Sequence, residues 1–449
     1  MRVREILVKG LFARFDYQIP MNLDERITII HGPNGFGKTA LLRLIASLFG
    51  STNAALLLVP YTELKVEFDN GHSISVVKMN TVKEGPPERH QLSLRFTYHN
   101  GSKAHHFTLS GRSPEQLEFP LHLIGEMVPE LDREAPELWR HLETGELLSL
   151  DEVVDRYWQR FPMKGTEEPP EWLKSVRQSI PIRFIRAERL QAAARRGRMR
   201  HAKPSPRRAV ELYAEELGAI IKQTLTEYAA LSQSLDRTFP ARVVTHPSPL
   251  PMEKLQTALR DIEAKRARLV EAGLLEQKGE DTTAQVLQHV DATNLPVLSV
   301  YVQDTHQKLS VFDELMAKVE LFKRSINERF LYKQLFVGKE GFGFMTAEGQ
   351  RLNPVSLSSG EQHEVVLLYE LLFKATKNSL ILLDEPEISL HVAWQEQFLS
   401  DLRAITGLSQ FDAIVATHSP QIISDRWDLT VELKGPRHEV LANTAPPSK

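Results

Sequence analysis

The sequence predicts an α/β protein with a parallel sheet at its centre, and three motifs support this prediction. A glycine-rich loop follows an apolar strand and opens a helix. A second apolar strand, near the other end of the chain, finishes in two carboxylates. A Ser-Ser-Gly-Glu string opens a further helix shortly before that second strand. Apolar strands that alternate with helices are typical of parallel sheets covered on both faces.

Composition limits the classes of protein to which the chain can belong. Its 449 residues suffice for two or three ordinary domains, and 42% hydrophobic with 25% charged residues is typical of a globular protein. The sequence contains neither a long apolar run nor a secretory signal, so we expect no membrane span and a cytoplasmic location. Cysteine is missing, which excludes disulfides. The net charge of −3 excludes a global attraction to nucleic acid.

The glycine-rich loop predicts a phosphate site. It lies between a predicted strand, Ile27–His31, and a predicted helix, Lys38–Phe49, and it matches the pattern G-x-x-x-x-G-K-[ST]. Backbone N–H groups in such a loop, together with the helix N-terminus, attract phosphate. We expect Lys38 to reach the β- and γ-phosphates and the Thr39 hydroxyl to ligate Mg²⁺. The residues expected to bind ATP are Gly32, Pro33, Asn34, Gly35, Phe36, Gly37, Lys38, Thr39 and Ala40.

Two later strands supply the predicted catalytic groups. Leu380–Leu383 is an apolar run that ends in Asp384 and Glu385. We expect Asp384 to hold Mg²⁺, directly or through water, and Glu385 to act as the general base toward the attacking water. His418 follows the apolar run Ile414–Ala416, and we expect it to contact the γ-phosphate.

The Ser-Ser-Gly-Glu string has two interpretations that can both hold. Ser358 and Glu361 have the spacing of a capping box for a helix over Ser358–Ala375. An exposed helix N-terminus is also an anion site. In a head-to-tail pair, the γ-phosphate held by Lys38 of one copy would be bound by four residues of the other, namely Ser358, Ser359, Gly360 and Glu361.

In this order, the motifs resemble those of ABC-type ATPases, in particular the SMC- and OLD-like branch of AAA family ATPases. Ile388–His391 resembles the dimer-contacting loop that follows the catalytic glutamate. A finer resemblance is to the ATPase subunits of PARIS- and Septu-type bacterial anti-phage systems, and to the ATPase half of overcoming-lysogenisation-defect nucleases. The segments that carry it are Gly10–Tyr17, Phe184–Leu190, Ala230–Pro240 and Asp384–Glu387.

The resemblance implies an ABC-ATPase head of the P-loop NTPase class, with an antiparallel β subdomain and an inserted helical or short coiled-coil arm. ABC-type heads also carry a sensor glutamine after a core strand, for which the sequence offers Glu188 and Gln191 without choosing between them. The expected boundaries are 1–110 for the first half of the head, 111–208 for a helical lid, core strand and basic stretch, 209–334 for the arm, 335–434 for the second half of the head and 435–449 for a tail.

Hydrophobic periodicity predicts the elements between the motifs. Residues 63–110 alternate as in an antiparallel meander, with hairpin turns at Asn70-Gly71 and Asn100-Gly101. Residues 126–155 predict amphipathic helices whose acidic outer faces are either solvated or dock a basic partner. Further helices are expected over Val210–Leu235, ended by Asp236–Pro240, and over Met252–Ala272 and Leu298–Phe336.

Arginines concentrate between Arg183 and Arg208, where Glu188 is the single opposing acid. Three interpretations remain open for this basic stretch. It is a solvated loop, it contacts the phosphate backbone of DNA, RNA or tRNA, or it docks an acidic protein.

The sequence therefore predicts an ATP- and Mg²⁺-dependent switch that closes as a head-to-tail dimer or a larger homo-oligomer. The preferred role is the sensor or scaffold subunit of an anti-phage system. Such a subunit would control a separate effector, such as a nuclease, in response to nucleic acid or a phage protein. The alternative is an SMC-like repair or recombination ATPase that clamps DNA. A transporter subunit is disfavoured by the 345 residues between Lys38 and Asp384.

Overall fold

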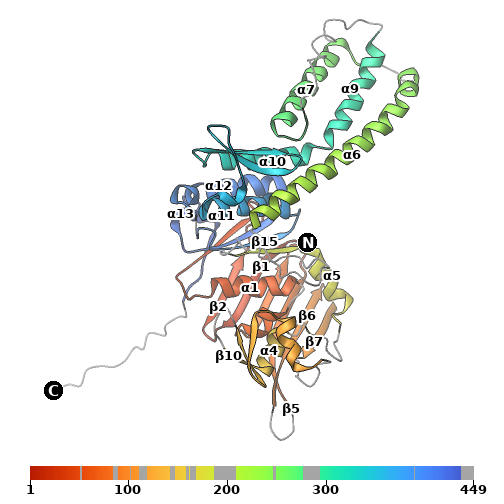
Figure 1. The fold of residues 1–449 in the computed structure, drawn as a ribbon. Coiled ribbons are helices and arrows are strands. Elements are labelled where there is room, and N and C mark those ends of the chain that lie inside the picture. The colour runs from red at the N-terminus through yellow and green to blue at the C-terminus, as the bar shows by residue number, and fades with distance from the viewer. Residues whose placement is uncertain are drawn as a thin grey trace, which may run out of the picture. The chain divides into compact units, whose positions relative to one another are not determined.

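The structure is a computed structural model (Figure 1), and it describes residues 1–50, 53–83, 89–101, 103–110, 119–141, 147–157, 161, 168–186, 209–245, 249–276, 294–388 and 390–435. The chain divides into two compact units. The first unit comprises Met1–Ala187, Ala375–Ile388 and Gln395–Lys449, and the second comprises Glu188–Lys374 and Ser389–Trp394. Both ends of the sequence therefore meet in the first unit.

Five parallel strands form the central sheet of the first unit. Their order is β11 (Ile182–Ile185), β15 (Leu380–Asp384), β16 (Asp412–Thr417), β3 (Ile27–His31) and β17 (Thr430–Glu432). Every residue of β15 and β16 is buried, as their continuous apolar runs predict. Helix α1 (Lys38–Phe49) follows β3 and packs against β11, β15 and β16. The α/β class and the strands that carry the motifs are thus confirmed.

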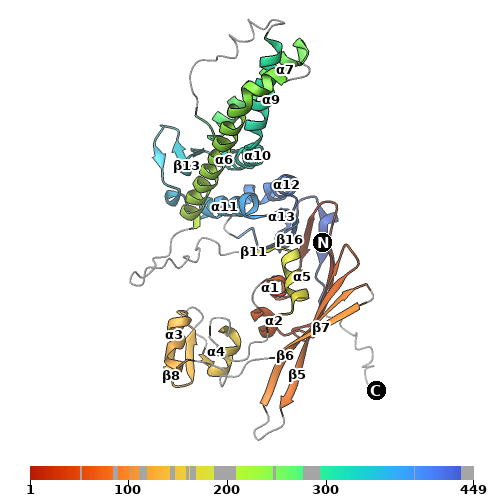
Figure 2. The ribbon, with the colours of Figure 1, turned by 90° about the vertical axis from the view of Figure 1, so that its right-hand side faces the viewer.

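A six-stranded antiparallel sheet forms the second layer of the first unit and confirms the predicted meander. Both hairpin glycines have a positive φ, +78° at Gly71 and +64° at Gly101, as turns of this kind require. Figure 2 shows the long β5–β6 hairpin extending past β7. The strand order is β2 (Phe15–Pro20), β1 (Val3–Leu11), β4 (Glu63–Phe68), β5 (Ser73–Lys83), β6 (Arg89–Asn100) and β7 (Lys103–Ser110).

The prediction of amphipathic helices over residues 126–155 is wrong for most of that segment. It forms a three-stranded sheet and a short helix, namely β8 (Leu131–Ala135), β9 (Leu138–His141), β10 (Leu147–Ser149) and α4 (Leu150–Tyr157), preceded by α3 (Ile124–Met127). Pro136 lies in the β8–β9 turn, where its missing N–H group disfavours a continuous helix through this segment. Trp139 is fully buried opposite Leu148, so cross-strand packing stabilises the sheet. Glu134 and Arg140 form an ion pair of 2.6 Å on its exposed face.

The remaining helices of the first unit are α2 (Ala54–Leu58), α5 (Glu171–Ser179), α12 (Val392–Ser409) and α13 (Pro420–Ile423). Arg177 on α5 holds the end of α1. Its Nε donates to the carbonyl oxygen of Leu48 at 3.0 Å and its Nη2 donates to Asn53 at 2.5 Å. A cation at a helix C-terminus is favourable, so Arg177 supports the helix that begins with Lys38.

The second unit combines helices with a small antiparallel sheet. Helices α6, α7 and α9 lie side by side in Figures 1 and 2. A Cβ at Gly341 (φ +104°) would lie 1.8 Å from the carbonyl oxygen of Ala214, so only glycine permits this approach of β13 to α6. The elements are α6 (Ala209–Thr245), α7 (Met252–Glu271), α9 (Leu295–Ser310), α10 (Asp313–Asn327), β12 (Lys333–Gly338), β13 (Gly341–Thr346), β14 (Arg351–Leu352) and α11 (Ser359–Tyr369), which continues as a π-helical turn (Glu370–Lys374).

Helix α6 does not end before Pro240, contrary to the prediction. It continues to Thr245 with Pro240 inside it, and Arg242 anchors the segment after the proline. The Arg242 guanidinium donates to the carbonyl oxygen of Leu235 at 2.7 Å, in the turn before the proline. The same guanidinium donates to the buried carboxylate of Asp304 on α9 at 2.7 Å.

The single helix expected over residues 298–336 is also wrong, because the segment forms two helices and a strand. Phe312 lies between α9 and α10, is fully buried, and packs against Tyr228 with ring centroids 5.3 Å apart. The chain leaves the second helix after Asn327, whose Oδ1 accepts the backbone N–H of Leu335 at 2.7 Å in β12. The helix over Met252–Glu271 is confirmed, and no helix in the described part of the chain is long and apolar enough to cross a membrane.

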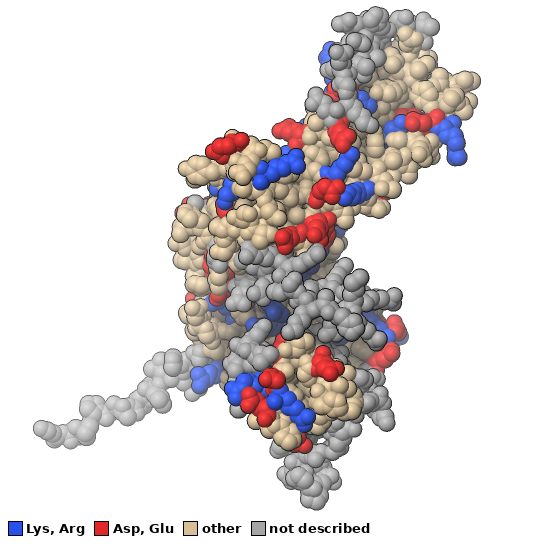
Figure 3. Space-filling model, in the orientation of Figure 1, with Lys and Arg blue, Asp and Glu red and all other residues tan. Residues whose placement is uncertain are grey.

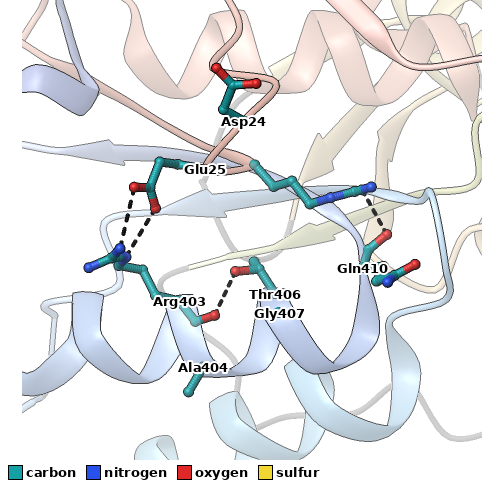
Figure 4. A pocket seen from close by; sticks show the side chains of 8 residues that line it. Asp24, Glu25, Arg403, Ala404, Thr406, Gly407 and Gln410 are labelled. Carbon is teal, nitrogen blue, oxygen red and sulfur yellow. Dashed lines mark hydrogen bonds and ion pairs between the residues drawn. The ribbon is translucent and has the colours of Figure 1, made fainter.

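A pocket of about 440 Å³ opens where the strands of the parallel sheet begin (Figure 4). Its lining includes the ion pair of Arg403 and Glu25, with 3.1 Å between Nε and Oε2, and Arg26, which donates to the carbonyl oxygen of Gln410 at 3.0 Å. The predicted site residues lie at the other edge, where the strands end. The pocket is therefore separate from the candidate site.

Candidate nucleotide site

The glycine-rich loop joins β3 to α1 as the sequence predicts. Gly35 (φ +87°) and Gly37 (φ +82°) have left-handed conformations, which favour glycine. A Cβ at Gly37 would also lie 2.9 Å from Leu11 Cδ2. The Tyr17 hydroxyl donates to the carbonyl oxygen of Phe36 at 2.8 Å. The loop is thus shaped by its glycines and held by the β1–β2 hairpin.

Lys38 lies inside the loop, with its side chain buried. Its Nζ donates to the carbonyl oxygen of Gly32 at 2.7 Å and to that of Pro33 at 3.3 Å. Burying an ammonium group is costly unless acceptors replace water, and here the loop supplies them. The N-terminus of α1 adds partial positive charge at the same place. Loop and lysine together form an anion site.

The first turn of α1 is hydrogen-bonded to the end of β15. Thr39 donates from Oγ1 to Asp384 Oδ1 at 2.9 Å, and Asp384 is 7% exposed. The two residues come together because β15 lies beside β16 and β16 lies beside β3, from which the loop leads to α1. The structure therefore brings together the two residues that the sequence predicts as metal ligands.

The electrostatics of Asp384 suit a cation. Burial raises the pKa of Asp384 above its ordinary range, the charges of Glu385 and Glu387 raise it further, and the Thr39 hydrogen bond and Arg43 only partly oppose this. A hydroxyl and a carboxylate are oxygen ligands of the kind that Mg²⁺ takes, together with phosphates and water. The described residues include no group of three or more His, Cys, Asp or Glu side chains able to hold a metal by themselves. Thr39 and Asp384 fit a Mg²⁺ ion that shares its ligands with a nucleotide.

Glu385 follows β15 in a strained conformation, with φ +45°. Its backbone N–H donates to the carbonyl oxygen of Ala416 at 2.8 Å, which fixes it beside the end of β16. His418 follows β16, and its Nδ1 lies 3.5 Å from Glu385 Oε1. The side chain of Glu385 is 25% exposed and that of His418 is 46% exposed. The predicted base and the predicted phosphate contact are therefore neighbours, and both are accessible to solvent.

Sequence reasoning gave no role to Glu387, which the structure places among these groups. Glu387 is 6% exposed, and its Oε1 accepts from the Thr417 hydroxyl at 2.5 Å and from the His418 backbone N–H at 3.1 Å. The same oxygen lies 3.4 Å from His418 Nδ1. The available signal was a third acid, directly after Asp384-Glu385-Pro386.

The Ser-Ser-Gly-Glu string lies in the second unit and forms the predicted capping box. The Ser358 hydroxyl accepts the backbone N–H of Glu361 at 3.3 Å, and the Glu361 carboxylate accepts the backbone N–H of Ser358 at 2.8 Å. Burial alone would raise the pKa of Glu361, but hydrogen bonds from Lys333 and Ser358 outweigh it and lower the pKa. The helix N-terminus, with Ser359 and Gly360, is thus built as predicted, while its contact with a second copy stays a prediction.

Several predicted features lie outside the described residues. They are Glu188 and Gln191, the two candidates for the sensor position; the basic stretch beyond Arg186; and Ser389 in the loop Ile388–His391. Leu390 in that loop is buried, and Ile388 is exposed. The choice between the sensor candidates and the role of the basic stretch stay predictions.

Three solved structures are similar to this chain. The first is the Smc head domain of Pyrococcus furiosus with an extended coiled coil, bound to the C-terminal domain of ScpA (13% identity, TM-score 0.32). The second is the SMC head domain from Thermotoga maritima (12% identity, TM-score 0.32), and the third is an SmcHead bound to the C-winged helix domain of ScpA (11% identity, TM-score 0.34). Each match covers 94% of this chain and 91% of the other.

A family model matches residues 200–424, just over half of the chain, and it is described as "AAA domain, putative AbiEii toxin, Type IV TA system". The matched range contains the capping box, β15 with its two carboxylates, Glu387 and His418. The glycine-rich loop lies before it and completes the site at the same edge of the sheet. The chain therefore belongs to this AAA domain family.

Proposed function

We propose that this protein hydrolyses ATP and uses the nucleotide as a conformational switch. The observation that carries the proposal is the hydrogen bond of 2.9 Å between Thr39 and Asp384. It joins the phosphate-binding loop to the strand that ends in acids, and this pairing of a loop with a metal-holding carboxylate is the arrangement that P-loop NTPases use.

Each residue at the sheet edge has a proposed role. The loop Gly32–Ala40 encloses the phosphates and Lys38 neutralises their charge, while Thr39 and Asp384 hold Mg²⁺. The ion, when bound, would offset negative charge on the phosphate oxygens. Glu385 orients and deprotonates the attacking water, and its carboxylate is accessible enough to reach one. His418 contacts the γ-phosphate from the end of β16.

The capping box serves a second copy of the chain in this proposal. Ser358, Ser359, Gly360 and Glu361 would bind the γ-phosphate held by Lys38 of the other copy, as an exposed helix N-terminus can. ATP then binds the closed pair more tightly than the open one, so it shifts the equilibrium toward closure. Hydrolysis removes that preference and reopens the pair.

The proposed biological role is the sensor or scaffold subunit of an anti-phage system that controls a separate effector, such as a nuclease. The resemblance of Ala230–Pro240 and Asp384–Glu387 to ATPases of such systems supports it. The description of the matching family, which names a toxin of a toxin–antitoxin system, also supports a role in a system of more than one protein. The trigger would be nucleic acid or a phage protein.

The runner-up role is a repair or recombination ATPase that clamps DNA. On the face drawn in Figure 3, the described Lys and Arg side chains lie interspersed with Asp and Glu, without a continuous basic area. A clamp that neutralises many phosphates needs such an area, and most arginines of the basic stretch lie outside the described residues.

Nucleotide binding by purified protein tests the ATPase proposal. We expect wild-type protein to bind ATP with Mg²⁺ and to hydrolyse it, and we expect Lys38→Ala to do neither. Lys434→Ala is the matched control, because this lysine lies just after β17 at the same sheet edge with its side chain 80% exposed. Wild-type affinity for ATP in Lys38→Ala would contradict the site.

Phage plating tests the biological role. Cells that express the chain with its genomic neighbours should form fewer plaques, and both Lys38→Ala and Glu385→Gln should restore plaque formation. Protection that survives both substitutions would contradict control by ATP. Duplex DNA binding that requires ATP and weakens steeply with salt would instead favour the clamp.

A further inference from the structure

We infer that Glu387 is the positioning residue for His418, and that it holds the imidazole in place beside the general base Glu385. The inference deepens the proposed function and rests on it. Glu387 follows β15 by three residues, whereas His418 directly follows β16. Because Glu387 is attached to the end of β15 and contacts the end of β16, it can set the distance between the side chains of Glu385 and His418.

The contacts of Glu387 converge on one carboxylate oxygen. Oε1 accepts from the Thr417 hydroxyl at 2.5 Å and from the His418 backbone N–H at 3.1 Å, and it lies 3.4 Å from His418 Nδ1. The backbone N–H of the histidine is hydrogen-bonded to this oxygen, and its ring nitrogen lies near the same atom. The first contact fixes where the residue leaves β16, and the second favours a side-chain rotation that keeps Nδ1 between Glu387 and Glu385.

The neighbours of Glu387 are themselves held. Thr417 is fully buried, and its Oγ1 accepts the backbone N–H of Ser419 at 2.9 Å. The Ser419 hydroxyl lies 3.1 Å from Oε1 of Gln395 on α12, and the Gln395 side-chain amide donates to the carbonyl oxygen of Glu387 at 3.4 Å. A ring of contacts therefore joins the chain after β15, the chain after β16 and the start of α12.

The stability of the fold does not explain why residue 387 is a glutamate. Glu387 is 6% exposed, and its second oxygen, Oε2, has no hydrogen-bond partner among the described residues. A buried charge with one unsatisfied oxygen is unfavourable for stability. Such a group is expected where function requires it, and the ring nitrogen of His418 lies 3.4 Å from the bonded oxygen of Glu387.

A double-mutant cycle tests whether Glu387 acts through His418. His418→Ala should lower kcat by about 10²-fold, and Glu387→Gln should lower it by about tenfold, with the KM for ATP within about twofold of wild type. The double variant should be no slower than His418→Ala alone, because Glu387 has nothing left to position. Additive losses would show that Glu387 acts independently of the histidine and would overturn the inference.

Asp412→Asn is the matched control. Asp412 is also a buried carboxylate, 4% exposed, but it begins β16, whereas Thr417 ends it. Asp412→Asn should keep wild-type kcat and KM even though it loses the ion pair with Arg2. A general effect of neutralising a buried acid in the first unit would instead lower kcat in both variants alike.

A readout without turnover completes the test. In protein labelled with ¹⁵N-histidine, the Nδ1 resonance that disappears in His418→Ala should shift in Glu387→Gln and stay unchanged in Asp412→Asn. An unchanged resonance in Glu387→Gln would overturn the inference while leaving the proposed ATPase intact. If wild-type protein shows no turnover that depends on Lys38, the proposed function fails and the inference fails with it.

Discussion

Thr39 and Asp384 are hydrogen-bonded at 2.9 Å although 345 residues separate them in the sequence. This contact joins the first turn of α1 to the last residue of β15, and Asp384 is almost fully buried there. A buried carboxylate whose main partner is a neutral hydroxyl is costly in the absence of a cation. The relationship therefore links the stability of the protein to its proposed metal site.

Asp384→Asn should stabilise the protein in the absence of nucleotide. Burial raises the pKa of Asp384 above its ordinary value of 3.8, so the folded state holds this proton more tightly than the unfolded chain. Stability then falls as pH rises through the window between 3.8 and the raised pKa, and the loss persists at pH 7. Asparagine still accepts from Thr39 but carries no charge, so we expect Tm at pH 7 to rise by about 2 °C.

Thermal unfolding at pH 4 and pH 7, with and without ATP and Mg²⁺, checks this prediction. The variant should gain more at pH 7 than at pH 4, and it should lose the Mg²⁺-dependent part of the stabilisation by ATP. Asp412→Asn is the control, and it should lower Tm because it loses its pair with Arg2. A lower Tm for Asp384→Asn at pH 7 would contradict the electrostatic account.

Glu385→Gln should bind ATP but turn it over at least about 10²-fold more slowly than wild type. The amide cannot accept a proton from water, while the phosphate-binding loop and the Thr39–Asp384 contact remain. Steady-state hydrolysis and equilibrium ATP binding, measured on the same preparation, separate the two effects. Normal turnover in this variant would place the general base elsewhere.

Ser358→Arg should abolish hydrolysis and leave ATP binding by single subunits unchanged. The arginine would replace a cap that satisfies the Glu361 N–H and would place a bulky side chain on the surface proposed to meet the other copy. Ser356→Arg is the control, because Ser356 is exposed and lies two residues before the cap, outside α11. Equal ATPase activity in Ser358→Arg and Ser356→Arg would argue against a shared site.

Arg242→Met should destabilise the second unit by about 3 kcal/mol. This value is at the lower end of the range for a broken buried ion pair, because the Arg242 side chain is one-third exposed. The substitution leaves the Asp304 carboxylate buried without its cation and removes the donor to the carbonyl oxygen of Leu235. Lys308→Met breaks a pair with the exposed Asp236 and should cost less than about 1 kcal/mol. Urea unfolding of both variants measures the difference, and equal losses would contradict the role of Arg242 in anchoring α6 beyond Pro240.

The sequence was sufficient where local chemistry decides the structure. Gly35 and Gly37 have positive φ values, which glycine adopts readily. A glycine-rich loop of this kind between a buried strand and a helix can adopt few other conformations. The apolar runs before Asp384 and after Phe411 likewise predicted buried parallel strands, which the structure confirms. The predicted capping box at Ser358 forms for the same local reason.

Sequence reasoning failed where a distant side chain decides the structure. Pro240 is a helix breaker by its own chemistry, whereas the contacts of Arg242 with Leu235 and with Asp304 from another helix anchor α6 beyond it. From the sequence alone, Trp139 fits the apolar face of a helix as well as that of a strand. The structure shows a strand, in which Trp139 lies opposite Leu148. Glu387 could not be assigned for the same reason, because its partners Thr417 and His418 lie 30 and 31 residues further along the chain.

The native mass of Glu385→Gln, measured with and without ATP and Mg²⁺, tests the central claim most directly. The account predicts a monomer of 51.1 kDa without nucleotide and a dimer or larger assembly with it. It also predicts that Ser358→Arg, added to the same protein, prevents the increase in mass. A protein that is saturated with ATP yet remains at 51.1 kDa would contradict the account, because a site shared between two copies could then not form.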